Sequence, residues 1–316
     1  MVPPSGAAVC DDVAVTDAPA VAAPGHGPAG RRSAQLPLAV ITVLAGAMLV
    51  GGSYVGPVGL LVIVALVQAA LVVGWVFGTG LPGRIGGLLM GLGAAAASDA
   101  LVSRWTDQGY APVLGVLGLA VPAMFVHQLT RGVVRSRVVE SLADITLLLV
   151  GVTGIAGLIL LRHQINGDVT APAVIGSLAA ALLAAHITDS VMPAPRVDSG
   201  LDRGIPAVLA GVLVGAGVGL LSLRRVIDFT GGRGAFVGAA VGAVGCLVSI
   251  GASFVGSHST LAVSTPEVSI TVAGFDDPEL TARRAGVARL QPVAAVLMTI
   301  GLTAPAGYLL ITALSG

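Results

Sequence analysis

The amino-acid sequence predicts an all-α integral membrane protein, a polytopic bundle of about nine transmembrane helices with its N-terminus inside and its C-terminus outside. Hydrophobic residues make up 55% of the chain and charged residues only 10%, whereas a soluble domain carries about 25% charged residues. The apolar stretches are roughly 17–25 residues long, which is the length that crosses a bilayer. All sixteen basic residues are arginines, and they fall almost entirely between these stretches.

The same composition excludes several classes of function. A chain without lysine cannot use a lysine amine in catalysis, and its net charge of zero gives no sign of a nucleic-acid partner. Cys10 lies in a polar segment and Cys246 lies in an apolar one, so neither a disulfide nor a cysteine metal site is expected. Membrane lipids are therefore the expected partners, and the cell membrane is the expected location.

The chain divides into a short tail and a membrane domain. Residues 1–34 are rich in Ala, Pro, Gly and Asp without apolar periodicity, so we expect a disordered cytoplasmic tail. Residues 35–316 form the membrane domain, with polar loops at 192–204 and 258–291. Residues 51–54 are expected to form a tight turn between the first two spans. The nine expected spans are 36–51, 55–77, 82–103, 111–127, 145–161, 171–191, 205–223, 235–256 and 292–314.

The arginines predict the orientation, because loops on the cytoplasmic side of a membrane are enriched in Lys and Arg. With the N-terminus inside, eleven arginines lie on the inner side and five on the outer side. This distribution favours an N-in, C-out chain. The cluster Arg224, Arg225 and Arg233 falls on the outer side and argues against it.

Three of the expected helices carry a glycine at every fourth position. Such a stripe lets a neighbouring helix backbone approach closely, which predicts packing against another helix, within the chain, in a partner protein or in a homo-oligomer. The stripes are Gly83/Gly87/Gly91, Gly211/Gly215/Gly219 and Gly234/Gly238/Gly242.

Ionisable side chains within membrane spans are costly, so each is a candidate functional residue. Asp99 and His127 lie near span ends, where an interfacial position is the simpler interpretation. His186 and Asp189 are three residues apart and share one face of a helix. They could bind a cation or relay a proton, or they could satisfy each other by hydrogen bonding.

The last long loop contains two local patterns. Residues 268–272 alternate between apolar and polar, as in a short strand. Asp277 and Pro278 then suit the N-cap and first position of a helix, and Glu279 is placed to pair with Arg283. Helix capping accounts for this second pattern without any further function.

Over about residues 140–316, the layout of the chain resembles the phosphatidate cytidylyltransferase family, which makes CDP-diacylglycerol from CTP and phosphatidate. The segment Ile187-Thr188-Asp189-Ser190 resembles the family's Ser-Asp-Thr motif, and Leu201-Asp202-Arg203-Gly204-Ile205 stands where the family enters its next span. The resemblance implies a Mg²⁺-dependent transferase. Its metal ligands would be Asp189, Asp276 and Glu279, and its phosphate-binding residues would be Arg196, Arg203, Arg283 and Arg284.

The chain departs from the family pattern in several places. Gly251-Ala252-Ser253-Phe254 has no carboxylate where the family carries its Gly-Asp-x-x-Glu-Ser motif, and Asp276 and Glu279 lie some twenty residues late. Arg289-Leu290-Gln291-Pro292 occupies the place of a terminal His-Gly-Gly and Asp-Arg signature. We therefore expect a cytidylyltransferase-like scaffold that has lost catalysis and serves as a membrane component or binds lipid.

Two alternatives stay open. One is a divergent but active transferase, which requires Asp189 to converge with Asp276 and Glu279. The other is a small-solute transporter in which His186, Asp189 and Asp99 line a path. The sequence shows no internal symmetry of the kind that inverted-repeat transporters carry.

Overall fold

The computed structural model describes residues 28–81, 83–130, 138–192, 194–195, 203–224, 226–229, 232–264 and 278–315. Within these ranges the secondary structure is helical and contains no β-strand. The described residues form nine α-helices, and all nine are long and apolar enough to cross a membrane. The predicted all-α, multi-pass membrane class is thereby confirmed.

The helices follow the expected spans closely. Two short 3-10 turns, Thr106–Gln108 and Ile227–Phe229, separate some of them. The nine α-helices are α1 Pro28–Val55, α2 Pro57–Gly78, α3 Arg84–Arg104, α4 Ala111–Thr130, α5 Val138–Arg162, α6 Gly167–Val191, α7 Ile205–Leu223, α8 Arg233–Ser264 and α9 Pro278–Ser315.

Several boundaries differ from the sequence-based expectation. Helix α1 continues through residues 51–54 and breaks only at Gly56, whose φ of 120° is accessible mainly to glycine. Helix α1 also begins at Pro28, inside the expected tail. Helices α8 and α9 extend to Ser264 and from Pro278, so both run into the expected loop 258–291. Residues 265–277, with the expected strand 268–272, lie outside the described residues.

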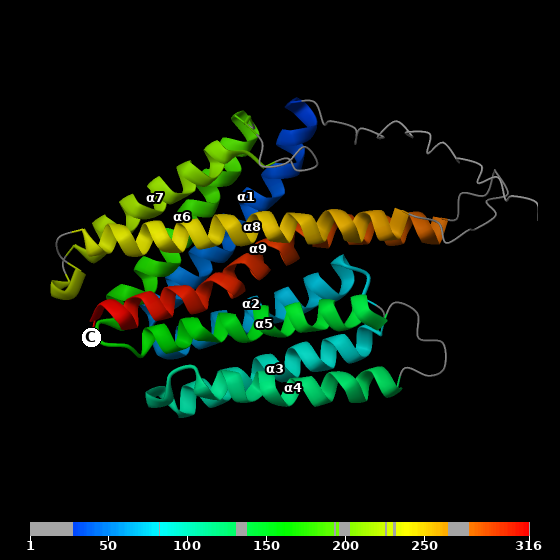
Figure 1. The fold of residues 1–316 in the computed structure, drawn as a ribbon, viewed down its shortest axis with the longest axis horizontal. Helices are drawn as coiled ribbons and strands as arrows, with labels where there is room; N and C mark the ends of the chain where they lie inside the picture. The colour runs from blue at the N-terminus through cyan, green and yellow to red at the C-terminus, as the bar shows by residue number, and fades with distance from the viewer. Residues whose placement is uncertain are drawn as a thin grey trace, which may run out of the picture.

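The helices form two groups joined by α9 (Figure 1). Helices α6, α7 and α8 pack on one another, and α1 packs on α6. Helices α2, α3, α4 and α5 form the other group, in which α4 packs on α3 and α5 at the outside. Helix α9 contacts α1, α2, α5, α6 and α8, so it links the two groups along the length of the molecule.

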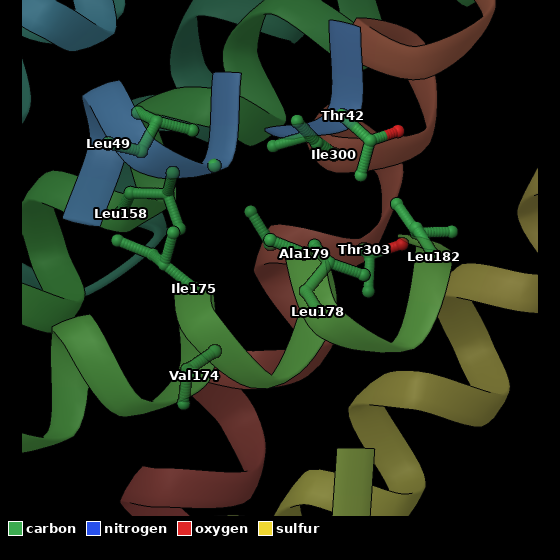
Figure 2. A pocket seen from close by; sticks show the side chains of 12 residues that line it. Thr42, Leu49, Leu158, Val174, Ile175, Leu178, Ala179, Leu182, Ile300 and Thr303 are labelled. Atoms are coloured by element: carbon green, nitrogen blue, oxygen red, sulfur yellow. The ribbon is translucent and has the colours of Figure 1, made fainter. Parts of the chain in front are cut away.

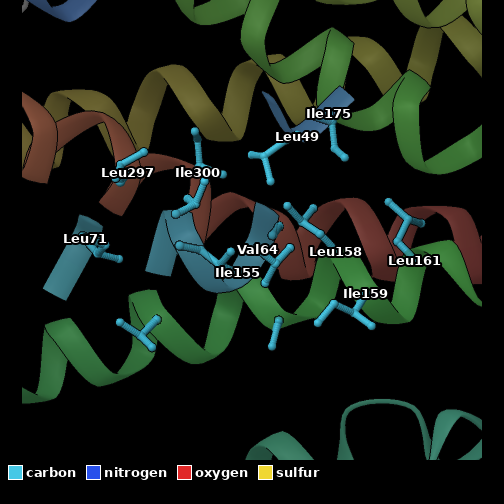
Figure 3. Packing of buried hydrophobic residues seen from close by; sticks show 14 of the residues in the cluster. Leu49, Val64, Leu71, Ile155, Leu158, Ile159, Leu161, Ile175, Leu297 and Ile300 are labelled. Carbon is cyan, nitrogen blue, oxygen red and sulfur yellow. The ribbon is translucent and has the colours of Figure 1, made fainter. Parts of the chain in front are cut away.

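The core lies where α1, α2, α5, α6 and α9 meet. Figure 3 shows branched aliphatic side chains from these helices, among them Leu49, Val64, Ile155 and Leu158, interdigitating there. Each of these four side chains is at most 2% exposed. Aliphatic side chains of α3, α4 and α7 such as Leu89, Leu119 and Leu213 face outward instead, as expected where lipid is the solvent.

Candidate functional site

The strongest candidate site is a buried polar cluster formed by Gln35, His186, Asp189, Arg203 and Ser249, called here the α6–α7 cluster. It gathers side chains from α1, α6 and α8 and from the residue two positions before α7. Each of the five residues is at most 8% exposed. Groups of this polarity are rarely buried unless they are paired and hydrogen-bonded.

Asp189 is the centre of the cluster. Its Oδ2 accepts a hydrogen bond from Nη1 of Arg203 at 3.0 Å, which makes a buried salt bridge. Its Oδ1 accepts a hydrogen bond from the backbone N–H of Gly204 at 2.8 Å. Both carboxylate oxygens are therefore occupied by groups of this chain at the start of α7.

Arg203 connects Asp189 to two further helices. Its Nη2 donates to Oγ of Ser249 on α8 at 3.0 Å, and its Nη1 lies 3.1 Å from Nδ1 of His186. The planar guanidinium carries several N–H donors in a fixed arrangement, which suits it to three partners at once. The predicted phosphate-binding residue is thus engaged within the protein.

His186 joins α1 to the cluster. Its Nδ1 lies 3.1 Å from Oε1 of Gln35 as well as 3.1 Å from Nη1 of Arg203. One ring nitrogen either donates or accepts, so it donates to Gln35 in one tautomer and accepts from Arg203 in the other. His186 and Asp189 share a helix face as predicted, and Arg203 is the residue that contacts both.

Pro195 and Ile205, at the two described ends of the loop before α7, meet beside this cluster. The backbone N–H of Ile205 donates to the carbonyl of Pro195 at 2.9 Å, which brings the two ends of the loop together. The space next to the cluster, bounded by Ala185, Cys246 and Ile250 among others, measures about 10 Å³. That volume accommodates about one water molecule and no larger ligand.

The described residues do not fit a Mg²⁺ ion. Magnesium requires several oxygen ligands in octahedral geometry, and no three His, Cys, Asp or Glu residues converge within the described part of the chain. At Asp189 the positive charge is supplied by the guanidinium of Arg203. Asp276 and Arg196 lie outside the described residues, as do the side chains of Glu279, Arg283 and Arg284.

A second polar contact lies among α2, α3 and α5. Asp99 is 7% exposed, and Nε2 of Gln68 donates to its Oδ1 at 2.9 Å. The structure therefore buries Asp99 between helices of the bundle, and its expected interfacial depth in the membrane stays a prediction. His127 lies against Gly86, at the other end of α3.

Sequence reasoning missed Gln35, Gln68 and Ser249 as members of these contacts. Uncharged side chains are common at helix surfaces, and nothing in their spacing indicates a partner. Gln68 carries one usable signal, because it is the only amide side chain in the apolar helix α2. An isolated amide in such a helix needs a hydrogen-bond partner from a neighbouring helix.

Two further spaces among the described residues are apolar. Figure 2 shows an enclosed pocket of about 10 Å³ between α1, α5, α6 and α9, where the hydroxyls of Thr42 and Thr303 bond to their own helix backbones. A groove of about 310 Å³ between α3 and α4 is lined by apolar side chains such as Leu89, Met90 and Leu119. Neither space presents a group for acid–base chemistry.

Comparisons with protein-family models, with curated proteins and with solved structures found no match for this chain.

Proposed function

We propose that the chain is a multi-pass protein of the cell membrane with a phosphatidate cytidylyltransferase-like scaffold, acting as a non-catalytic, lipid-contacting membrane component. The observation that carries the proposal is the engagement of both oxygens of Asp189 by Arg203 and by the Gly204 N–H. In the transferase interpretation this carboxylate would have to bind metal.

A transferase that uses CTP must neutralise the charge of a triphosphate. Mg²⁺ ions held by closely spaced carboxylates commonly do this, and losing such ligands removes most of the stabilisation of the transition state. A Mg²⁺ ion at Asp189 would have to displace a guanidinium that is itself buried and bonded to His186 and Ser249. Displacement would leave the buried arginine charge without a counter-ion, which is strongly unfavourable.

The cluster favours a structural task instead. Through Asp189 and Arg203 it joins the end of α6 to the start of α7 and to α8, and through Gln35 it reaches α1. Polar groups that bond across helices hold a bundle together where the hydrophobic effect offers little driving force. A rigid bundle with apolar side chains on its outer faces suits a membrane component that contacts lipid.

The test is an assay of CDP-diacylglycerol formation by the purified chain in nanodiscs containing phosphatidate, with labelled CTP and Mg²⁺. We expect no more product than protein-free nanodiscs give. The assay includes Asp189→Asn and a matched control, Asp168→Asn, which changes a carboxylate in the first turn of the same helix. An active transferase assayed in parallel shows that the conditions support the reaction.

One result would overturn the proposal. If the wild-type chain and Asp168→Asn both form product and Asp189→Asn does not, the chain is a divergent, active transferase. Thermal unfolding of each sample in the same nanodiscs confirms that the proteins compared are folded.

A further inference from the structure

Asp99 on α3 is an acidic side chain held inside the membrane by an amide. Gln68, which is 0% exposed, uses its Nε2 to donate both to Oδ1 of Asp99 at 2.9 Å and to the backbone carbonyl of Val152 at 3.1 Å. Gln68 lies in the middle of α2 and Val152 in the middle of α5. The contact therefore joins three membrane-spanning helices.

No positive charge compensates Asp99 within the described residues. Helix α3 packs against α2, α4 and α5, and Asp99 has Gln68 as its side-chain partner. Helix α2 contains no ionisable side chain. Apart from Asp99 itself, the ionisable side chains of α3, α4 and α5 lie toward the ends of these helices. They are Arg84, Arg104, His127, Glu140, Asp144 and Arg162. A carboxylate in this position carries an uncompensated charge in a medium that disfavours it.

The Gln68 side chain also has an unused acceptor. Its Oε1 is buried and has no hydrogen-bond partner. Buried polar atoms are nearly always satisfied, so Oε1 is an unused acceptor in an apolar setting. A protonated Asp99 can carry its proton on Oδ2 while its Oδ1 continues to accept from Nε2 of Gln68, so the amide keeps its bond to the carbonyl of Val152.

We infer that Asp99 and Gln68 form a proton-binding site within the membrane. Nε2 of Gln68 donates to Oδ1 of Asp99 both when the side chain is a carboxylate and when it is a carboxylic acid with its proton on Oδ2. The proton forms an O–H bond with a carboxylate oxygen of Asp99. No other covalent bond changes. Water at the Arg104 end of α3, five residues or about 7.5 Å along the helix axis, is the source of the proton.

The surroundings favour a proton over a metal ion. Sodium sites in membranes use backbone carbonyls that are freed where a helix is unwound, and α2, α3 and α5 are continuous at these residues. Within the described residues, Asp99 belongs to no group of three or more His, Cys, Asp or Glu side chains that could hold a metal ion. One carboxylate and one amide suffice for a proton and provide too few oxygens for a metal ion.

Infrared difference spectroscopy of the protein in nanodiscs tests the site. Spectra recorded between acidic and alkaline pH, in H₂O and in D₂O, should contain the carbonyl stretching band of a protonated carboxyl group that is shielded from bulk water. We expect this band to disappear in Asp99→Asn and to return, shifted, in Asp99→Glu. In Gln68→Leu the band should change frequency, because the carbonyl oxygen of the acid loses its hydrogen-bond donor.

Gln128→Leu is the matched control, because Gln128 is another buried amide in a membrane span and bonds to Ser141 rather than to Asp99. It should leave the band unchanged. A titrating band that persists in folded Asp99→Asn, or no such band in the wild-type protein, would overturn the assignment of Asp99. A band that is lost in Asp99→Asn but keeps its frequency in Gln68→Leu would overturn the role of Gln68.

Discussion

The α6–α7 cluster illustrates how a single charged residue is accommodated inside a membrane protein. Arg203 is 7% exposed, and its guanidinium contacts Asp189, His186 and Ser249. Removing a charge from water costs several kcal/mol, and the cost is offset only when the opposite charge and further hydrogen bonds are well placed. The pair is therefore tightly interdependent, because either residue alone would be an uncompensated buried charge.

That interdependence leads to a prediction for single and double substitutions. Arg203→Met leaves Asp189 buried without its counter-ion and should lower the free energy of unfolding by about 3–5 kcal/mol. The double variant Arg203→Met/Asp189→Leu removes both charges and should be more stable than Arg203→Met alone. Thermal unfolding in nanodiscs measures the series. Equal stability of wild type and Arg203→Met would show that the salt bridge contributes nothing to the fold.

At the scale of the helices, the backbones of α7 and α8 pack closely against each other at their glycines. A Cβ atom built on Gly215 would lie 2.6 Å from the carbonyl oxygen of Gly238, and one on Gly242 would lie 3.0 Å from that of Gly211. Two of the three predicted glycine stripes thus face each other within the chain. Small residues permit this contact because they let helix backbones pack directly in a membrane.

A substitution on each face of α7 tests this contact. Gly215→Ala forces the two helices apart and should destabilise the protein by about 1–3 kcal/mol, the usual cost of overpacking. Gly217→Ala lies on the same helix with no atom within 4 Å of its added Cβ. It should be neutral or stabilise the helix by up to about 1 kcal/mol. The two variants are compared by thermal unfolding in nanodiscs, and similar stabilities would contradict a close α7–α8 contact.

At the scale of the whole molecule, the sequence predicts the helices far better than the contacts between them. Apolar length alone identifies all nine spans, because the bilayer requires it of every helix. Asp189 and His186 stand out because charge is rare in a span, whereas the partners Gln35 and Ser249 are uncharged and distant in sequence. Which helices become neighbours depends on side-chain packing across the bundle, and apart from the glycine stripes of α7 and α8 the local sequence carries no readable pattern for it.

The last prediction concerns how the bundle sits in the membrane. Nine spans place the two termini on opposite sides, and the arginine distribution favours the N-terminus inside. A membrane-impermeant maleimide applied to intact cells should therefore label Ser315→Cys in a Cys10→Ser background. The same reagent should label Cys10 of the wild-type chain only after the membrane is permeabilised. Cys246 is 3% exposed and serves as the internal negative control in both chains.

The labelling pattern tests separately the number of spans and the orientation of the chain. Labelling of Cys10 from outside, with Ser315→Cys protected, would keep nine spans and reverse the orientation, which would mean that Arg224, Arg225 and Arg233 outweigh the other arginines. Labelling of both positions from the same side would show that one of the nine helices does not cross. Helix α4 is the first to examine in that case, because it lies at the outside of its group and packs mainly on α3 and α5.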